Sequence, residues 1–176
     1  MPYLIPENIE TERLNLRMFI DDDWRAMHEH YSDEICTAFT MSRTLSEGES
    51  WRTVASIIGH WHLRGYGPYA VEDKLSGMLL GTVGLWYPND WPETEIKWAL
   101  LRRYWGKGFA SEATRAVKKM AAEFLPDSSL ISLIHSENVA SIQLALAIGA
   151  KFEKEIEFRN GKWHVYRHSS CAQNEI

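Results

Sequence analysis

The chain has 176 residues, 45% of them hydrophobic and 24% charged, and a formal net charge of -5 at pH 7. This fits one soluble globular domain, so we expect a single domain over 1–176, with a core over about 11–168 and a loose tail over 169–176. No apolar run approaches the roughly 18 residues of a membrane-spanning helix, and the N-terminus lacks the pattern of a secretory signal. We therefore expect a cytoplasmic protein with no membrane partner.

The acidic balance also argues against a nucleic-acid partner, because non-specific binding to phosphates needs a basic surface. It favours a cationic substrate at long range. Cys36 and Cys171 lie far apart without metal-ligand spacing, so we expect reduced thiols.

Apolar periodicity predicts the elements in chain order. In the first half we expect a half-buried strand, two helices and a β-hairpin. These are "RLNLRMF" (13–19), "DDDWRAMHEHY" (21–31), "SEGESWRTVASIIGHWHLR" (46–64), and "YAVE" with "MLLGTVGLW" (69–72 and 78–86). Ser46 and Glu49 have the spacing of a capping box, and Gly65 marks the end of that helix.

In the second half we expect a third strand of that meander, a helix ended by Pro126, a buried strand, a second helix and a final hairpin. These are "TEIKWALL" (94–101), about 109–125, "SLISLIH" (129–135), "NVASIQLALAI" (138–148) and "KFEKEIEFRNGKWHVYRH" (151–168), which turns at Asn160-Gly161. This order predicts an α/β (α+β) domain in which helices cover a single mixed sheet.

The stretch "RRYWGKGFASEA" (102–113) resembles a phosphate-binding loop. A Walker A loop needs Ser or Thr after its lysine, but Gly108 follows Lys107. A dinucleotide fingerprint needs a third glycine, where this chain has Ser111. A third interpretation is that small residues let backbone N–H groups approach a diphosphate at the start of a helix. A plain turn between strand and helix is the alternative.

Two motifs together favour the third interpretation. The stretch "TEIKWALLRRYWGKGFASEA", followed about thirty residues later by "NVASIQLALAIGAKF", resembles the GNAT superfamily of acetyl-CoA-dependent N-acetyltransferases. "YWGKGFASEA" and "TERLNLR" look like the branch of Rim-type ribosomal-protein N-terminal acetyltransferases. The resemblance covers about 11–168 and implies a GNAT-like, mostly antiparallel mixed sheet with helices on both faces.

The resemblance also implies a site for acetyl-CoA. The family writes its pyrophosphate loop Gln/Arg-x-x-Gly-x-Gly/Ala, which falls here on 105–110 with Trp105 as a departure at the first position. The backbone of the strand before the loop would pair with the pantetheine, at an edge opened by splaying of "TEIKWALL" away from "SLISLIH". The expected acetyl-CoA contacts are Trp98, Ala99, Leu100, Gly106, Lys107, Gly108, Phe109, Ala110, Ser111 and Asn138.

Acetyl transfer to an amine requires a base, because amines of pKa ~8 to ~10.4 are protonated at neutral pH. Glu95 stands where many members carry a catalytic glutamate, so it is the candidate base. If Glu95 is not the base, Glu93 or a chain of water molecules could take that role. The alternative for Glu95 itself is that it is only a solvated residue of the strand. Many members supply a tyrosine to the leaving thiolate, but that position is Ala145 here. Ser141 is the remaining hydroxyl, as a general acid, a cofactor contact or a cap.

We therefore expect an N-acetyltransferase that moves acetyl from acetyl-CoA to a primary amine, either a protein N-terminus or a small molecule, by direct attack. The alternative is a non-catalytic CoA-binding sensor or interaction module. We expect no metal, because histidines two apart on a helix, as in "HEH" and "HWH", diverge by about 200°. A homodimer is expected only because homodimers are the commonest oligomers of soluble proteins. The acceptor pocket is expected to include Asp90, Trp91, Glu93 and Trp163.

Overall fold

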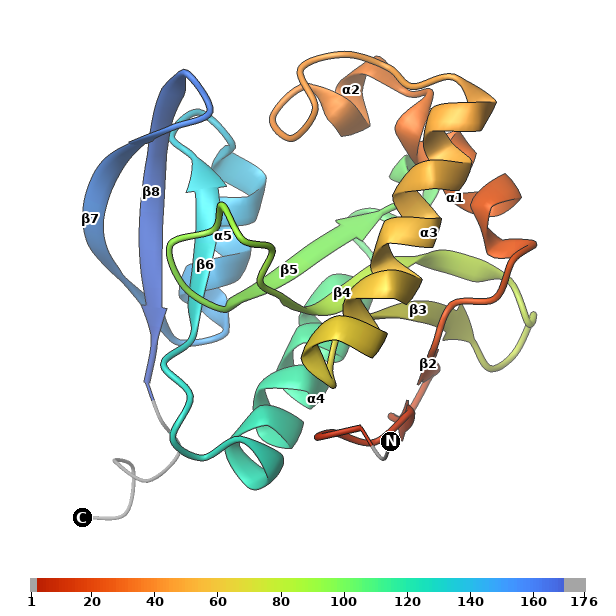
Figure 1. Cartoon of the computed structure of the whole chain (residues 1–176), viewed down its shortest axis with the longest axis horizontal. Coiled ribbons are helices and arrows are strands. Elements are labelled where there is room, and N and C mark those ends of the chain that lie inside the picture. Colours follow the sequence, from red (N-terminus) through yellow and green to blue (C-terminus); the bar gives the residue numbers. More distant parts are fainter. Residues whose placement is uncertain (1–2, 170–176) are drawn as a thin grey trace.

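The computed structural model describes residues 3–169, in which eight strands form one sheet in the order β1-β2-β3-β4-β5-β6-β8-β7 (Figure 1). Only β5 and β6 pair in parallel; the other neighbours are antiparallel. The strands are β1 (Asn8–Glu10), β2 (Leu14–Arg17), β3 (Pro68–Asp73), β4 (Leu79–Trp86), β5 (Glu95–Leu100), β6 (Ile131–His135), β7 (Ala150–Phe158) and β8 (Gly161–His168). The expected single mixed sheet is confirmed.

Helices lie on both faces of this sheet (Figure 1). They are α1 (Asp23–Tyr31), α2 (Glu34–Thr37), α3 (Glu47–Arg64), α4 (Phe109–Phe124) and α5 (Val139–Ala147), with a 3₁₀ turn at Arg102–Tyr104. α1 packs on α3 and β4, α4 packs on β4 and β5, and α5 packs on β6 and β7. The expected capping box of α3 is present: Ser46 accepts from the Glu49 N–H, and the Glu49 carboxylate accepts from the Ser46 N–H.

The sheet opens between β5 and β6. The β4–β5 ladder runs over six residues of β5, whereas β6 meets β5 at a single register pair, Glu95 with Ile131. Figure 1 shows the two strands diverging beyond that point. The apolar interior divides accordingly: a large core lies under β2 to β5, and two smaller clusters lie around β6 and β8. The expected splaying of these strands is confirmed. It leaves the edge of β5 that faces β6 without a strand partner beyond Glu95 among the residues that the structure describes.

Three local features differ from the sequence prediction. The short elements β1 and α2 were not expected, because three and four residues carry too little periodicity to detect. The final hairpin turns at Arg159-Asn160, not at Asn160-Gly161: Phe158 pairs with Gly161, and the two residues between them have φ of 49° and 59°. The Arg159 guanidinium stacks 4.6 Å above the centre of the Trp91 ring, a contact that favours this register.

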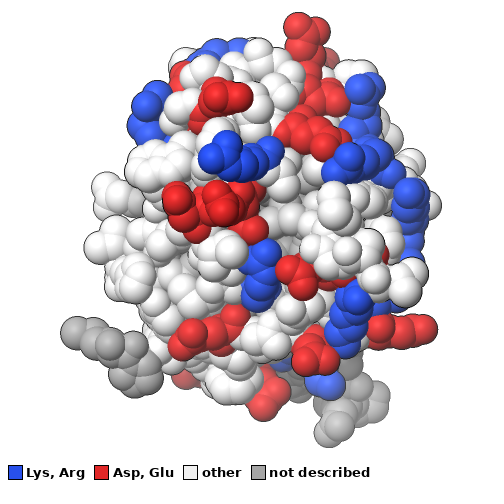
Figure 2. Space-filling model, turned by 90° about the vertical axis from the view of Figure 1, so that its right-hand side faces the viewer, with Lys and Arg blue, Asp and Glu red and all other residues white. Residues whose placement is uncertain are grey.

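Acidic and basic side chains are interspersed over the face seen in Figure 2. None of the helices in residues 3–169 combines the length and apolar character needed to cross a bilayer. Cys171 and nearly all of the expected tail lie outside the described residues.

Candidate functional site

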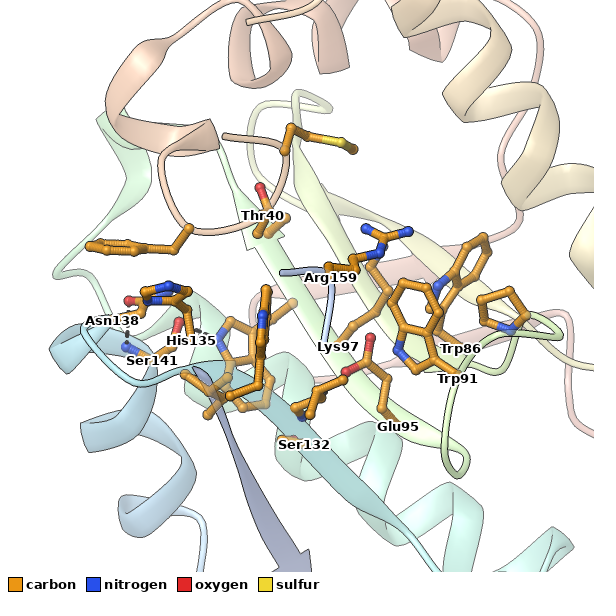
Figure 3. Close-up of a pocket in the computed structure, with 18 of the residues that line it drawn as sticks. Thr40, Trp86, Trp91, Glu95, Lys97, Ser132, His135, Asn138, Ser141 and Arg159 are labelled. Carbon is orange, nitrogen blue, oxygen red and sulfur yellow. Dashed lines mark hydrogen bonds between the residues drawn. The ribbon is translucent and has the colours of Figure 1, made fainter. Parts of the chain in front are cut away.

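Two connected cavities occupy the opening between β5 and β6. One, which we call the groove, has a volume of about 540 Å³ and runs from β5 to the starts of α4 and α5. The other, the pocket, has a volume of about 340 Å³ and lies between β5, β6, the β4–β5 loop and the β7–β8 turn (Figure 3). The two share His30, Phe39, Thr40, Trp98, Ala99, Asn138 and Ser141. A ligand in the groove can therefore present one end to the pocket.

Most of the residues predicted to bind acetyl-CoA line the groove. They are Trp98, Ala99, Leu100, Gly106, Gly108, Phe109, Ala110, Ser111 and Asn138. The Lys107 side chain is exposed and does not line the groove; its ammonium lies 5.5 Å from the centre of the Tyr104 ring. The contact between Lys107 and acetyl-CoA therefore stays a prediction, which the backbone of this residue or its mobile side chain would have to supply. Lys107 lies in the turn between Gly106 and Gly108, both of which have positive φ.

The glycine loop ends in an uncapped helix start. Gly108 is the N-cap of α4 with φ of 79°, a conformation that other residues adopt only with strain. No side chain caps the first turn of α4, so its N–H groups remain available to a ligand. An exposed helix N-terminus with free N–H groups is a site for an anion such as a phosphate.

A contact from the N-terminal strand region holds this loop in place. The Glu112 carboxylate, in the first turn of α4, accepts from the Thr11 hydroxyl at 2.6 Å and from the Arg13 guanidinium at 2.7 Å. Arg13 also donates to the Lys107 carbonyl at 3.0 Å. Burial alone would raise the pKa of Glu112, but these hydrogen bonds outweigh it, so the pKa lies below its usual value. The only acidic side chain of that first turn is thereby neutralised and held away from the anion site.

The open edge of β5 presents backbone groups of alternate residues. The Ile96 carbonyl faces β6, where it accepts from the Ser132 hydroxyl at 2.8 Å. Alternation along a strand points the backbone groups of Trp98 and Leu100 to the same edge, whereas Ala99 pairs with Thr82 of β4. The backbone partners for an added chain are then Trp98 and the Leu100 N–H, and Ala99 contributes a small side chain.

Trp105, at the first position of the glycine loop, contacts β5. Its indole N–H donates to the Leu100 carbonyl at 2.9 Å. The His30 Nδ1 lies 3.1 Å from the same carbonyl, so this nitrogen carries the proton. Burial is the main reason that the pKa of His30 is lowered, which keeps the ring neutral. Together Trp105 and His30 fix the end of β5 next to the groove.

Ser141 and Asn138 lie where the groove joins the pocket (Figure 3). The Asn138 side chain accepts from the Ser141 N–H at 3.2 Å and caps α5. The Ser141 hydroxyl oxygen accepts from the Trp98 indole at 3.2 Å, which leaves its proton free to point into the cavity. Ala145, at the family's tyrosine position, is fully buried.

Glu95 is a buried acid inside the pocket and not a solvated strand residue. The residue is 6% exposed, and its carboxylate accepts from the Leu133 N–H at 3.3 Å. Burial raises its pKa above the usual value, despite the opposing effects of Lys97, the Trp91 indole, Leu133 and Arg159. A carboxylate with a raised pKa is a stronger base at neutral pH.

Glu93 occupies a different position. Its carboxylate forms a bidentate ion pair with Arg167 at 2.6 and 2.8 Å, and it does not line either cavity. The hydrogen bonds from Arg167 are the main reason that its pKa is lowered. Glu93 is therefore neither a wall of the acceptor pocket nor a free base, whereas Asp90, Trp91 and Trp163 line the pocket as expected.

Two cations in the pocket were not singled out from the sequence. The Lys97 ammonium lies 4.7 Å above the centre of the Trp86 ring, and Arg159 stacks on Trp91. Lys97 was detectable in principle, because it lies two residues after Glu95 and therefore on the same face of β5. Arg159 had no such signal, since it reaches the pocket only through the fold of the last hairpin.

The paired histidines have separate contacts. His28 contacts the Ser50 hydroxyl at 2.8 Å, His60 contacts the Tyr66 carbonyl and accepts from the Tyr87 N–H, and His62 contacts Tyr3. Within residues 3–169 no group of three or more His, Cys, Asp or Glu side chains is arranged to hold a metal ion. Cys36 lines the groove as a free thiol whose pKa burial raises.

A family model described as an acetyltransferase (GNAT) domain matches residues 13–151. The chain belongs to the GNAT acetyltransferase family. Its sequence is 29% identical over 169 residues to the uncharacterized protein YkkB of Bacillus subtilis (strain 168), covering 91% of this chain and 94% of YkkB. It is 27% identical over 151 residues to the uncharacterized N-acetyltransferase p20 of Bacillus licheniformis, covering 85% and 84%.

Solved structures of GNAT proteins share the fold of this chain. An acetyltransferase from Agrobacterium tumefaciens str. C58 superposes with a TM-score of 0.83 at 25% identity, covering 94% of this chain and 95% of that one. RimL, a ribosomal L7/L12 α-N-protein acetyltransferase solved with coenzyme A, superposes with a TM-score of 0.71 at 17% identity, covering 93% and 96%. At that identity the likeness to RimL concerns the fold alone.

Proposed function

We propose that this GNAT protein is an N-acetyltransferase that transfers acetyl from acetyl-CoA to a primary amine by direct attack. The observation that carries the proposal is the joining of the groove to a pocket that holds a buried carboxylate, Glu95. A transferase for two substrates needs this arrangement, with one site for the donor, one for the acceptor and a base where they meet.

The groove suits acetyl-CoA on physical grounds. A diphosphate fits the uncapped N-terminus of α4, where Gly108, Ala110 and Ser111 allow close approach to the backbone. A pantetheine has amide groups that can pair with the free edge of β5 at Trp98, as an added strand would. Acetyl-CoA bound in this way supplies an acetyl thioester at the junction with the pocket.

Glu95 then takes the proton of the attacking amine. An amine of pKa ~8 to ~10 is mostly protonated at neutral pH, and only its neutral form is a nucleophile. The raised pKa of Glu95 makes its carboxylate better matched to this transfer. A backbone N–H near Ala99 or Leu100 is a candidate donor to the oxyanion; the alternation of β5 favours Leu100, whose N–H faces the opening.

Ser141 is proposed as a donor to the departing sulfur. Its hydroxyl accepts from Trp98 and lies where the cavities join, so its proton can reach a ligand there. A thiol of pKa ~8.5 already leaves readily as a thiolate, so the contribution of Ser141 is expected to be small.

Two measurements test the proposal. Acetyl-CoA should bind in a calorimetric titration, and thiol release should depend on an added amine across a panel of small amines and N-terminal peptides. The panel includes peptides because "YWGKGFASEA" and "TERLNLR" resemble motifs of the Rim-type acetyltransferases, which act on protein N-termini. No binding at millimolar acetyl-CoA would overturn the proposal. Binding without release for any amine would favour the alternative of a CoA-binding sensor or interaction module.

A further inference from the structure

The pocket that faces Glu95 contains two cations and rings that support them. Lys97 and Arg159 lie over Trp86 and Trp91, whose ring centres are 6.3 Å apart. Figure 3 shows both cationic side chains beside the Glu95 carboxylate. With Asp90, the pocket is lined by two carboxylates and two cations, and the two cations lie against the aromatic wall.

In the part of the chain that the structure describes, neither of these cations donates a hydrogen bond to another protein group. Within residues 3–169 the Lys97 ammonium has no hydrogen-bond acceptor and no carboxylate within 4 Å, although it is largely withdrawn from solvent. Burial lowers its pKa, and the nearby Glu95 carboxylate opposes that effect. Arg159 has only the Asp90 carboxylate, at 3.9 Å, which is too long for a hydrogen bond. Because a buried ammonium without a hydrogen-bond acceptor is costly, a ligand is expected to supply an acceptor to Lys97. The Arg159 side chain is 47% exposed, so water solvates its guanidinium until a ligand anion takes its place.

This pattern separates the classes of acceptor that remained open. A polyamine or an aminoglycoside would bring further ammonium groups next to Lys97 and Arg159, where like charges repel. The N-terminus of a protein carries an amide in place of a carboxylate beside its amine. A free amino acid carries both an amine for Glu95 and a carboxylate for the two cations.

Large aromatic side chains form one part of the lining, and the space is small. Trp86, Trp91, Phe158 and Trp163 form much of the wall. A volume of about 340 Å³ lies at the low end of the range for small-molecule sites, ~300–1,000 Å³. The walls and the volume suit one apolar or aromatic side chain.

We propose that the acetyl acceptor is a small zwitterionic amine of the amino-acid class with an apolar or aromatic side chain. Its amine faces Glu95, and its carboxylate lies between Lys97 and Arg159. This inference rests on the proposed N-acetyltransferase function and names the substrate class for the same pocket.

The first test is a matched panel with the wild-type protein in a thiol-release assay with acetyl-CoA. The panel comprises L-phenylalanine, L-phenylalaninamide and 2-phenylethylamine, the equivalent tryptophan series, a dipeptide with N-terminal phenylalanine, and spermidine. We expect kcat/KM for the free amino acid to exceed that of its amide and of its decarboxylated amine by at least about tenfold, because only the free amino acid offers a carboxylate to Lys97 and Arg159. Equal or better use of the amide, the dipeptide or spermidine would overturn the proposal.

The second test removes the cations. Lys97→Met and Arg159→Gln should each raise the KM for L-phenylalanine at least about tenfold and reduce its preference over 2-phenylethylamine by a similar factor. Lys97→Arg should restore part of the preference. Lys162→Met is the matched control, because Lys162 is exposed on β8, pairs with Glu155 and lines neither cavity. If Lys97→Met and Arg159→Gln lower the turnover of every acceptor equally, the two cations act on the base Glu95 and do not bind a substrate carboxylate, and the proposal fails.

Failure of this inference differs from failure of the proposed function. If acetyl-CoA does not bind and no amine releases thiol, the N-acetyltransferase proposal falls, and this inference falls with it. If acetyl-CoA binds but the amino acids are neither acetylated nor bound, only the assignment of the acceptor is overturned. Calorimetry with L-phenylalanine and the CoA-bound protein measures that binding directly, and a mis-folded Lys97→Met variant leaves the wild-type panel and Arg159→Gln to decide.

Discussion

The groove and the pocket are built from different materials. The groove includes the open edge of β5, the uncapped start of α4 and the small residues of the glycine loop, whose backbone can bind a ligand. The pocket consists of charged and aromatic side chains that several separate segments bring together. A backbone site fits a cofactor that is the same for all members of a family, and a side-chain site can vary with the acceptor. Substitutions in the groove and in the pocket should therefore have different effects.

The largest expected effect is on the chemical step. Glu95→Gln should lower kcat by about 10²–10⁴-fold and leave the Kd for acetyl-CoA unchanged, because the carboxylate lies in the pocket and not in the groove. Glu93→Gln is the matched control and should retain turnover, since Glu93 is paired with Arg167. Stopped-time thiol release and calorimetry measure the two quantities.

The same variant has a pH signature. Glu95 acts as a base only when ionised, and its pKa is raised, so wild-type kcat should fall as the pH drops through that raised pKa. The loss caused by Glu95→Gln should be largest near neutral pH and should shrink in alkali, where the amine loses its proton unaided. A constant loss across the pH range would remove Glu95 as the base.

The next effect concerns the groove alone. Ser111→Glu adds a negative charge to the first turn of α4 and should weaken acetyl-CoA binding by about tenfold or more, while a negative charge at a helix start does not destabilise the fold. Ser111 is a cleaner probe than Gly108, whose φ of 79° would strain any other residue. Ser128→Glu, an exposed site after the end of α4, makes the same change far from the loop. Equal affinity for Ser111→Glu and Ser128→Glu would refute the anion site.

A smaller effect is expected where the halves meet. Ser141→Ala should lower kcat by less than about tenfold, because the thiolate leaves readily without an acid. A loss beyond a hundredfold would instead give Ser141 the role of an essential proton donor. Single-turnover measurements separate this effect on chemistry from any change in binding.

The last effect has the opposite sign. A carboxyl group whose folded pKa is raised binds protons more tightly in the folded state, so its contribution to stability is lost as the pH rises through that pKa. Glu95→Gln should therefore raise Tm at pH 8, and the gain should disappear as the pH falls below the usual pKa of 4.5. In a chain of this size each 1 kcal/mol corresponds to about 2–4 °C. A lower Tm for the variant at pH 8 would contradict the assigned burial cost.

The sequence predicted the groove better than the pocket. The glycine loop, the start of α4 and the splayed edge of β5 depend on residues that lie close together in the chain, so their spacing carries the information. Lys107 differs from the other predicted contacts in that it does not line the groove, and its role stays a prediction. Arg159 was missed because a turn shifted by one residue places it over Trp91, a contact 68 positions away that local spacing does not encode.

The single register pair that joins β5 to β6 has a consequence for motion. Within residues 3–169 Glu95 and Ile131 are the one register pair between β5 and β6, side-chain contacts such as Ser132 with Ile96 add to it, and each half of the sheet has its own apolar clusters. The half formed by β6, β7 and β8 can thus open as a separate cooperative unit, and its amides should exchange with deuterium faster than those of β3 and β4. A ligand that spans the opening between β5 and β6 would act as an added strand. Its binding should slow the exchange of β6 amides with deuterium.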